Sequence, residues 1–404
     1  MNKIKTRIYS AGIVFLAAIS LISSEINFAQ TNKESEFVNL YSKWKNGPPT
    51  DPSFFPIGVW YQAINLASQY KAAGINFYFA IGRGPRKEQL DSLRQSGMYL
   101  ICHQSEEGLA NIDDKTIIAW MHGDEPDNLR RDPKTNKRAP IPPENTIEDY
   151  HTVAAKDPTR PVMLNLGQGV ANDDWPGRGP DATLDVYPEY CKGADIVSFD
   201  VYPVVNIRKP DGEKYLWYVA KGVDRLRKWT NYEKPVWNVI ECTHIHDPLK
   251  KATPVQVRSE VWMSLIHGSK GICYFVHQFK PEFNASALLS DPEMLKGVTE
   301  INKQIHELAP ALNSPTVEGM ASVESSNPEV PIDVMVKKYK GDTYIFSVAM
   351  RIDPVKGTFK IKGLKDTISA EVIGEGRTVE IKNGGFQESF DSYGVHLYKI
   401  QGTK

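Results

Sequence analysis

Two acidic stretches of this chain contain the residue types needed for acid–base or nucleophilic chemistry. Glu125 lies in WMHGDEPDN, and Glu241 lies in PVWNVIECTHIH. Each glutamate follows an apolar run of the kind that predicts a fully buried strand, and stands where that run gives way to polar residues. The carboxyl ends of parallel barrel strands are where side chains face a substrate. Two carboxyl groups brought there by different strands are the minimum requirement for glycoside hydrolysis.

The expected chemistry depends on how far apart these two glutamates lie. In glycoside hydrolysis one carboxyl group protonates the departing oxygen, while another attacks or stabilises the anomeric carbon. If Glu125 ends a fourth strand and Glu241 a seventh, they stand across the barrel mouth, and a gap of about 5–5.5 Å would imply retention of configuration. The alternative role for each is an ion pair or a cap on the following helix. A charge buried after NVI needs a reason to be there, which favours a functional Glu241.

Eight apolar runs alternate with helical patterns and would position these residues. The expected strands are 54–61, 75–82, 98–104, 117–125, 161–167, 195–203, 235–243 and 271–279. Amphipathic segments such as 65–74, 86–97 and 215–229 lie between them, and several end at a glycine or close to one, as helix C-caps prefer. Buried strands alternating with helices favour a parallel sheet. Eight such units predict a closed (β/α)₈ barrel rather than an open doubly wound sheet, because no glycine-rich loop follows the first strand.

The hydrophobic period changes to two after a closing helix expected at 294–308 and a linker at 309–315. Short alternating runs separated by turn residues predict an antiparallel β-sandwich. The expected organisation is therefore an α/β chain with a catalytic (β/α)₈ barrel at 54–310 and a C-terminal antiparallel β-sandwich at 316–404 that serves as a packing accessory.

At this point the chain resembles the large clan of retaining (β/α)₈ glycoside hydrolases usually called clan A. The resemblance covers roughly residues 54–308 and rests on the strand order and on the two glutamate positions. It implies that Glu125 is the acid/base and Glu241 the nucleophile. The clan usually has Asn before the acid/base, where this chain has Asp124, and it usually ends strand eight with Trp, which this chain lacks. Asp124 could raise the pKa of Glu125, or could itself be the acid with Glu125 supporting it.

Other polar and aromatic strand ends are candidates for binding a sugar. Tyr202 resembles the clan's tyrosine that hydrogen-bonds the nucleophile, and Asp200 points the same way on an ideal strand. Neutral hydrogen-bonding groups suit sugar hydroxyls, and aromatic faces suit the apolar face of a pyranose. The complete set expected to bind substrate is Trp60, His103, Asp124, Asn165, Asp200, Tyr202, His277 and Gln278, with Gln104, Tyr61 and Trp175 as weaker candidates.

Two further patterns suggest other chemistry. His244 and His246 have the spacing of a metal-binding pair, but a barrel metal site needs further ligands, so no metal and no cofactor is expected. Arg83 and Arg86 flank Gly-Pro and could bind an anionic group or be solvated loop charges. The alternatives to a glycoside hydrolase are therefore a non-catalytic glycan-binding protein on the same scaffold and a metal-dependent hydrolase.

Composition and the N-terminal segment indicate the cellular setting. The chain has 404 residues and a formal charge of -1, which argues against a nucleic-acid partner. Residues 1–30 combine a basic start, a short apolar stretch and a cleavage-like end, as in a signal peptide, and 31–53 form a polar lead-in. We therefore expect an exported protein, periplasmic or extracellular, with no membrane span in the mature chain. Three of its four cysteines lie in expected core strands, so no disulfides are predicted.

Overall fold

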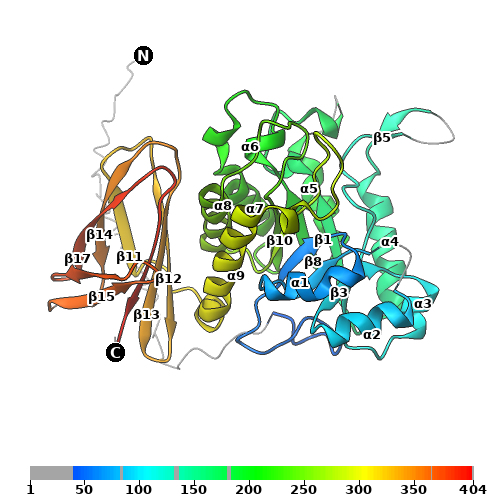
Figure 1. The fold of residues 1–404 in the computed structure, drawn as a ribbon, viewed down its shortest axis with the longest axis horizontal. Helices are drawn as coiled ribbons and strands as arrows, with labels where there is room; N and C mark the ends of the chain where they lie inside the picture. The colour runs from blue at the N-terminus through cyan, green and yellow to red at the C-terminus, as the bar shows by residue number, and fades with distance from the viewer. Residues whose placement is uncertain (1–39, 82–84, 132–135, 180–182, 365, 403–404) are drawn as a thin grey trace, which may run out of the picture. The chain divides into compact units, whose positions relative to one another are not determined.

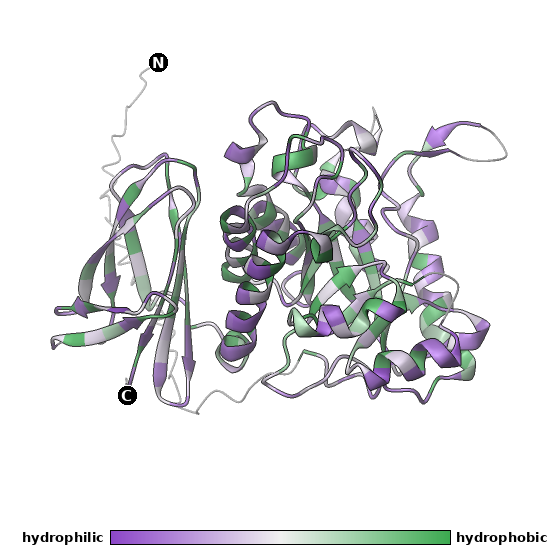
Figure 2. Ribbon diagram, viewed as in Figure 1, coloured by the Kyte–Doolittle hydropathy of each residue, from purple (hydrophilic) through white to green (hydrophobic). Residues whose placement is uncertain are grey.

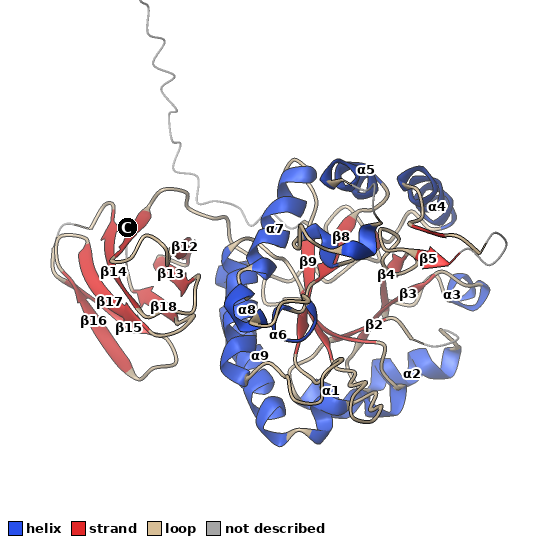
Figure 3. Cartoon of the chain, turned by 90° about the horizontal axis from the view of Figure 1, so that it is seen from above, coloured by secondary structure: helices blue, strands red, loops and turns tan. Residues whose placement is uncertain are grey.

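The computed structural model describes residues 40–81, 85–131, 136–179, 183–364 and 366–402. Its first part is a closed parallel barrel with strand order β1-β10-β9-β8-β7-β4-β3-β2, and Figure 3 shows the ring of strands inside a layer of helices. The barrel strands are β1 (Ile57–Trp60), β2 (Phe77–Phe79), β3 (Tyr99–His103), β4 (Ile117–Met121), β7 (Val162–Leu166), β8 (Ile196–Asp200), β9 (Val236–Glu241) and β10 (Ile272–Phe275). All eight expected strands are present, so the predicted barrel is confirmed.

Helices follow the strands and cover the outside of the barrel (Figure 1). They are α1 (Ala67–Ala72), α2 (Lys87–Gln95), α3 (Glu106–Ala110), α4 (Pro143–Lys156), α5 (Tyr187–Lys192), α6 (Pro203–Asn206), α7 (Tyr218–Trp229), α8 (Pro254–Ile266) and α9 (Pro292–Leu312). The packing of α7 on β8 requires a glycine, because a Cβ at Gly222 would come within 2.2 Å of the Phe199 ring. This close approach fixes β8, the strand that ends at Asp200.

Barrel strands are buried on both faces, as their continuous apolar runs predict. On β9, Trp237 and Val239 pack with the residues that fill the barrel, whereas Val236 and Ile240 pack with the helical layer. The strand segments are accordingly hydrophobic in Figure 2, while the small hairpin of β5 (Arg130–Arg131) and β6 (Arg138–Ala139) is hydrophilic. This apolar filling makes the barrel a packed core, with room for chemistry at its ends.

Helix α9 runs further than the sequence suggests, since it includes Ala309 and Pro310 and ends at Leu312. A proline in the final turn removes one backbone hydrogen bond, and the burial of Ala311 and Leu312 compensates for that loss. The linker to the next strand is therefore shorter than expected.

Two antiparallel sheets follow, as the change of hydrophobic period predicts. One sheet has the order β11-β14-β17 and the other β12-β13-β18-β15-β16. The strands are β11 (Ala321–Ser325), β12 (Ile332–Tyr339), β13 (Asp342–Ala349), β14 (Val355–Ile361), β15 (Ile368–Val372), β16 (Arg377–Ile381), β17 (Gly385–Phe390) and β18 (Val395–Ile400). Helix α8 contacts this region through Trp262, whose ring lies 5.4 Å from that of Phe346, and through Ser259, which donates to the Tyr393 carbonyl at 2.9 Å.

The cysteines Cys102, Cys191, Cys242 and Cys273 are buried and unpaired. Among the described helices, none combines the length and apolar character of a membrane span. The expected signal peptide at 1–30, the first part of the lead-in, and Arg83 lie outside the described residues.

Candidate functional site

A cavity of about 190 Å³ opens at the carboxyl end of the barrel strands. Its walls combine carboxyl groups, hydrogen-bonding groups and aromatic rings, contributed by the ends of β1, β4, β7, β8, β9 and β10 and the loops that follow them. The lining residues are Trp60, Asp124, Glu125, Asn165, Asp200, Tyr202, Val239, Ile245, His246, Phe275 and Phe279. The structure therefore brings together six of the ten residues that the sequence predicted for the site.

Glu125 lies in a turn after β4, and not within the strand as expected, because the strand ends at Met121. Its φ of 44° is in the left-handed region, which is uncommon for a residue with a side chain. The surrounding turn holds this conformation: the Glu125 amide donates to the Asn165 carbonyl at 3.0 Å. Two residues later, buried Asp127 accepts hydrogen bonds from the Gly167 amide at 2.8 Å and from the Tyr187 hydroxyl at 3.0 Å. Backbone outliers that are held in this way occur frequently at functional sites.

Asp124 is held in the cavity by a hydrogen-bonded chain across two strands. Ser198 of β8 donates to Asn165 Oδ1 at 2.7 Å, and Asn165 Nδ2 donates to Asp124 Oδ1 at 3.0 Å. Burial, and then the nearby charge of Glu125, raises the pKa of Asp124 to about 6. Asn165 is thus committed to orienting Asp124 in this structure.

Asp200, the last residue of β8, faces Glu125 from a different strand. The side chains of Glu125 and Tyr202 lie close enough to Asp200 to shift its pKa. The buried Oδ1 atom of Asp200 has no hydrogen-bond partner among the described residues. Burial, and then the charge of Glu125, raises the pKa of Asp200 well above its usual value. A carboxyl group with a raised pKa beside a second carboxyl group is the arrangement of an acid paired with a base.

Glu241 ends β9 as predicted, but its side chain is fully buried and does not line the cavity. Its two oxygens accept hydrogen bonds from the amides of Val204 at 2.7 Å and Val205 at 3.1 Å, in the first turn of α6. Glu260 of α8 is also fully buried beside it, and burial, followed by the charge of Glu241, raises the pKa of Glu260 well above its usual range. Burial raises the pKa of Glu241 itself to about 7.

Aromatic side chains line the same cavity as the carboxyl groups. Trp60 packs on Phe79 with ring centroids 4.5 Å apart, while Phe275 lies 5.3 Å from Tyr202. Phe279 is 41% exposed, and its ring stacks on His246 at 5.8 Å. The aromatic and apolar side chains after strands seven and eight were not predicted to line the site. The sequence pattern of a core strand does not indicate which of its aromatic residues face the barrel mouth.

The remaining predicted residues lie outside this cavity. His103 is exposed, with Nδ1 3.3 Å from the Met121 carbonyl. His277 Nε2 lies 3.1 Å from the Tyr61 carbonyl, and Gln278 donates to the Glu282 carbonyl at 3.3 Å. Trp175 also lies outside, with its indole donating to Asn128 at 2.7 Å.

Tyr61 is not in the helical layer, although the alternation of side chains along a strand would place it there. It follows β1 at a φ of 44° and is 48% exposed. The two histidines of the possible metal pair diverge: His244 Nδ1 lies 3.0 Å from the Lys250 carbonyl, whereas His246 stacks on Phe279. In the described ranges, no three or more His, Cys, Asp or Glu side chains form a group that could hold a metal ion.

Comparison with known proteins gives a likeness of fold. No family model matches the chain, and no curated protein matches its sequence. Among solved structures, α-galactosidase I from Mortierella vinacea superposes with a TM-score of 0.51 at 11% identity, over 87% of this chain and 98% of that one. AmyP in complex with maltose gives 0.50 at 9% identity, over 90% and 98%. The resemblance to barrel glycoside hydrolases is therefore confirmed at the level of the fold.

Proposed function

We propose that this protein is an exported glycoside hydrolase in which Glu125 and Asp200 are the catalytic carboxyl groups. The observation that carries the proposal is that these two side chains, one from the turn after β4 and one from the end of β8, line the same cavity at the carboxyl end of the barrel. They interact there closely enough for the charge of Glu125 to raise the pKa of Asp200. The substrate would be an oligo- or polysaccharide. Support for a saccharide comes from the aromatic wall beside the carboxyl groups, and from the two similar structures, one named for galactosidase activity and the other solved with maltose.

The protonation of the pair suggests how the roles are divided. The raised pKa of Asp200 favours its protonated form, so Asp200 donates its proton to the departing glycosidic oxygen. The Glu125 carboxylate attacks the anomeric carbon, and the bond to the leaving group breaks. Asp200, now ionised, takes a proton from water, and the resulting hydroxide releases the sugar from Glu125. Two carboxyl groups whose side chains interact directly leave no room for the intervening water of an inverting enzyme, which favours retention.

This assignment moves the nucleophile from Glu241, where the resemblance placed it, to a carboxyl group that lines the cavity. Both oxygens of Glu241 are already used by α6 amides, and the side chain is fully buried. In our proposal Glu241 is a positioning residue, because Val204 and Val205 directly follow Pro203 and Tyr202. Fixing their amides fixes Tyr202, which lines the cavity with Asp200 and acts on its pKa.

Isosteric variants of the three carboxyl groups test the proposal. We expect Glu125→Gln and Asp200→Asn each to lower kcat by at least about 10²–10⁴-fold on a natural glycoside, the usual contribution of acid–base catalysis. Glu241→Gln keeps an acceptor for one α6 amide, so we expect a loss of about tenfold or less. Circular dichroism and a melting curve confirm that each variant is folded. A folded Glu241→Gln variant that is inactive, beside an active Asp200→Asn variant, would return the nucleophile to Glu241.

Leaving-group and azide experiments separate the two roles. A dinitrophenyl glycoside needs no acid, so Asp200→Ala should still form the glycosyl-enzyme, and azide should accelerate its turnover by replacing the unactivated water. Glu125→Ala should remain inactive with both. If Glu125→Ala shows the rescue instead, Glu125 is the acid/base that the resemblance implied. Saturable binding of oligosaccharides without turnover by the unmodified protein would favour the glycan-binding alternative.

A further inference from the structure

Four basic side chains meet at the opposite end of the barrel, around two adjoining cavities of about 200 and 140 Å³. Lys270, which precedes β10, and Lys337 of β12 line both cavities. Arg227 and Lys234 line the smaller one. We call the two together the basic cavity. It lies beside the amino ends of β9 and β10, far along the strands from the carboxyl groups of the mouth.

None of these four cations forms an ion pair with a carboxylate in the described part of the chain. Their hydrogen bonds go to backbone carbonyls: Lys337 Nζ donates to Ser314 at 2.6 Å, Arg227 to His267 at 2.7 Å, and Lys234 to Cys191 at 2.8 Å. Carbonyl partners satisfy hydrogen-bonding groups but do not neutralise charge.

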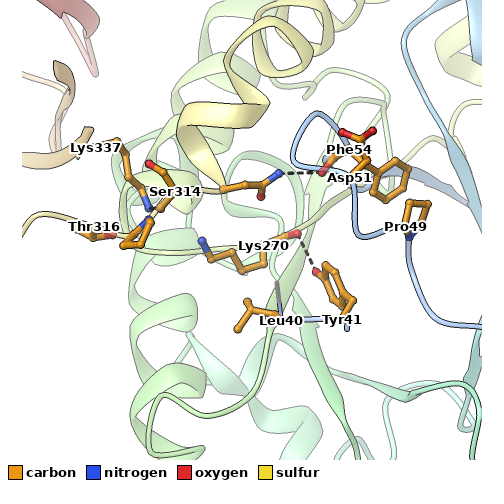
Figure 4. A pocket seen from close by; sticks show the side chains of 11 residues that line it. Leu40, Tyr41, Pro49, Asp51, Phe54, Lys270, Ser314, Thr316 and Lys337 are labelled. Atoms are coloured by element: carbon orange, nitrogen blue, oxygen red, sulfur yellow. Dashed lines mark hydrogen bonds between the residues drawn. The ribbon is translucent and has the colours of Figure 1, made fainter. Parts of the chain in front are cut away.

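Carboxylates near the basic cavity offset its charge only in part. Asp51 lines the larger cavity, but it accepts hydrogen bonds from the backbone and hydroxyl of Ser53, and Figure 4 shows it at the far side, beside Phe54. Glu318 is exposed and makes the smallest of the contributions that act on Lys337. The charges of Asp195 and Glu233 act on Lys234. The positive charge that has no carboxylate partner is therefore concentrated on Lys270, Lys337 and Arg227.

The two lysines respond to this environment in the direction expected of crowded, desolvated cations. Lys337 is only 2% exposed. Burial, and then the charges of Lys270 and Arg227, lowers the pKa of Lys337 to about 6. Burial, and then Arg227, lowers the pKa of Lys270 to about 8. An anion among them would reverse this effect, because a neighbouring opposite charge favours the charged form of a lysine.

The geometry also suits a small ligand with several acceptor oxygens. In Figure 4 the amino ends of Lys270 and Lys337 both point toward the segment that contains Ser314 and Thr316. An ammonium group has three donors, and Lys337 uses one of them on Ser314, so donors remain for a ligand. A volume of about 200 Å³ exceeds the share of several water molecules, each about 30 Å³ in the liquid.

We propose that the basic cavity is a binding site for a tetrahedral oxyanion, either free sulfate or phosphate or the same group as an ester on a sugar. Lysines act as point charges toward such groups, and the Arg227 guanidinium offers a planar fork of donors. This site is independent of the chemistry at the mouth. An anion bound there would contact both Lys270 of the barrel and Lys337 in the first strand of the larger C-terminal sheet.

Equilibrium dialysis with radiolabelled sulfate, at constant ionic strength in sodium chloride, tests the proposal directly. We expect one sulfate per chain with saturable binding. Lys270→Met and Lys337→Met should each weaken it at least about tenfold, and Lys270→Arg should largely retain it. The matched control is Lys296→Met, which removes an exposed lysine of α9 paired with Glu300. Dialysis is used because sulfate also stabilises proteins by exclusion from their surface, so a melting-temperature rise alone would not identify a site.

The outcomes are distinct. No saturable sulfate or phosphate binding to the unmodified protein, or equal binding by the folded Lys270→Met/Lys337→Met double variant, would overturn the proposal. Competition between sulfate and glucose 6-sulfate, with glucose as the control, identifies the source. Displacement by the ester supports a site for a sulfated glycan, whereas displacement by free phosphate alone supports a site for the free ion.

Discussion

The two ends of the barrel each gather charges of one sign, but they relieve the repulsion differently. At the mouth, Asp124, Glu125 and Asp200 surround one cavity, and proton uptake can neutralise a carboxyl group there, as the raised pKa of Asp200 indicates. At the other end, Lys270 and Lys337 have lowered pKa values and no carboxylate partner in the described ranges. Crowding like charges costs stability, so such clusters persist where they serve a purpose. A proton that can be transferred suits catalysis, whereas lysines that are favoured in their charged form when an anion binds suit an anionic ligand.

The largest contrast we expect is between a buried cation that has a partner and one that does not. Arg160 is 1% exposed and pairs with the fully buried Asp157 at 2.7 Å, while donating to the Ile117 carbonyl at 2.7 Å. Arg160→Met leaves Asp157 as an uncompensated buried charge and should cost about 3–5 kcal/mol. In sulfate-free buffer, Lys337→Met should change stability by no more than about 1 kcal/mol, because it also removes a desolvated charge.

Urea unfolding followed by fluorescence measures both differences. Equal and large losses in the two variants would mean that Lys337 has a partner as effective as Asp157, and would weaken the comparison between the two ends. A loss of stability as large as predicted for Arg160→Met, together with a gain of stability for Lys337→Met, would strengthen the comparison between the two ends.

A second effect concerns His267, which joins α7 to β12. His267 Nδ1 lies 2.9 Å from Asp224 and Nε2 lies 3.0 Å from Asp333. Burial lowers the pKa of His267, but the hydrogen bonds to these carboxylates outweigh it and raise the value to about 9. A pKa raised on folding stabilises the protein fully below the unfolded value of about 6.5, and this contribution is lost as pH rises through about 9.

His267→Gln should therefore lower the free energy of unfolding by about 2 kcal/mol at pH 6, and by much less at pH 10. We take less than the full shift implies because both aspartates are partly exposed. His306→Gln is the control. The His306 ring lies 2.7 Å from the backbone carbonyl of Gly74, and in the described part of the chain it has no carboxylate partner. A pH-independent loss in His267→Gln would show that its role is packing alone.

Most of the fold could be predicted from the sequence, because the barrel depends on the repeated order of apolar runs and helical patterns. Each expected strand contains the observed one, yet the expected ranges overran the ends. For β4 the expected strand reached Glu125, whereas the last strand residue is Met121. The three residues between them belong to the turn that sets the direction of the Glu125 side chain, and nothing in a local hydrophobic pattern encodes that turn.

The site could be predicted only in part, for a related reason. Sequence reasoning assigned Asp124, Glu125, Asn165, Asp200, Tyr202 and Trp60 to one site, since each lies at or near a strand end, and all six line one cavity. It gave Glu241 the same weight, because a glutamate that ends a buried strand looks alike whether it faces a substrate or caps a neighbouring helix. The partners of Glu241 are Val204 and Val205 of α6, which are distant in sequence. The basic cavity was missed because its lysines come from separate elements.

A third and smaller effect should appear at the mouth in the variant Asp124→Asn. The charge of Asp124 is one of the contributions that raise the pKa of Asp200. Removing it should lower the pKa of Asp200, and an acid is needed in its protonated form. The alkaline limb of the kcat/KM profile should therefore move to lower pH, with roughly a several-fold loss of kcat/KM on the alkaline side. Asp174→Asn, at a side chain that is 79% exposed, is the control and should leave the profile unchanged.

The smallest effect we predict concerns the aromatic wall, which should contribute binding and not chemistry. Phe279 lines the cavity and is 41% exposed, whereas Phe283 is 65% exposed, does not line it, and lies 5.8 Å from Phe279 in the same aromatic group. Phe279→Ala should raise KM about fivefold with kcat nearly unchanged, since a stacked ring contributes about 0.5–1.5 kcal/mol of uniform binding. Phe283→Ala is matched in ring and loop, and should leave KM within about twofold. A fall in kcat without a change in KM for Phe279→Ala would mean that the ring acts on the transition state. The aromatic wall would then contribute to catalysis, and not only to binding.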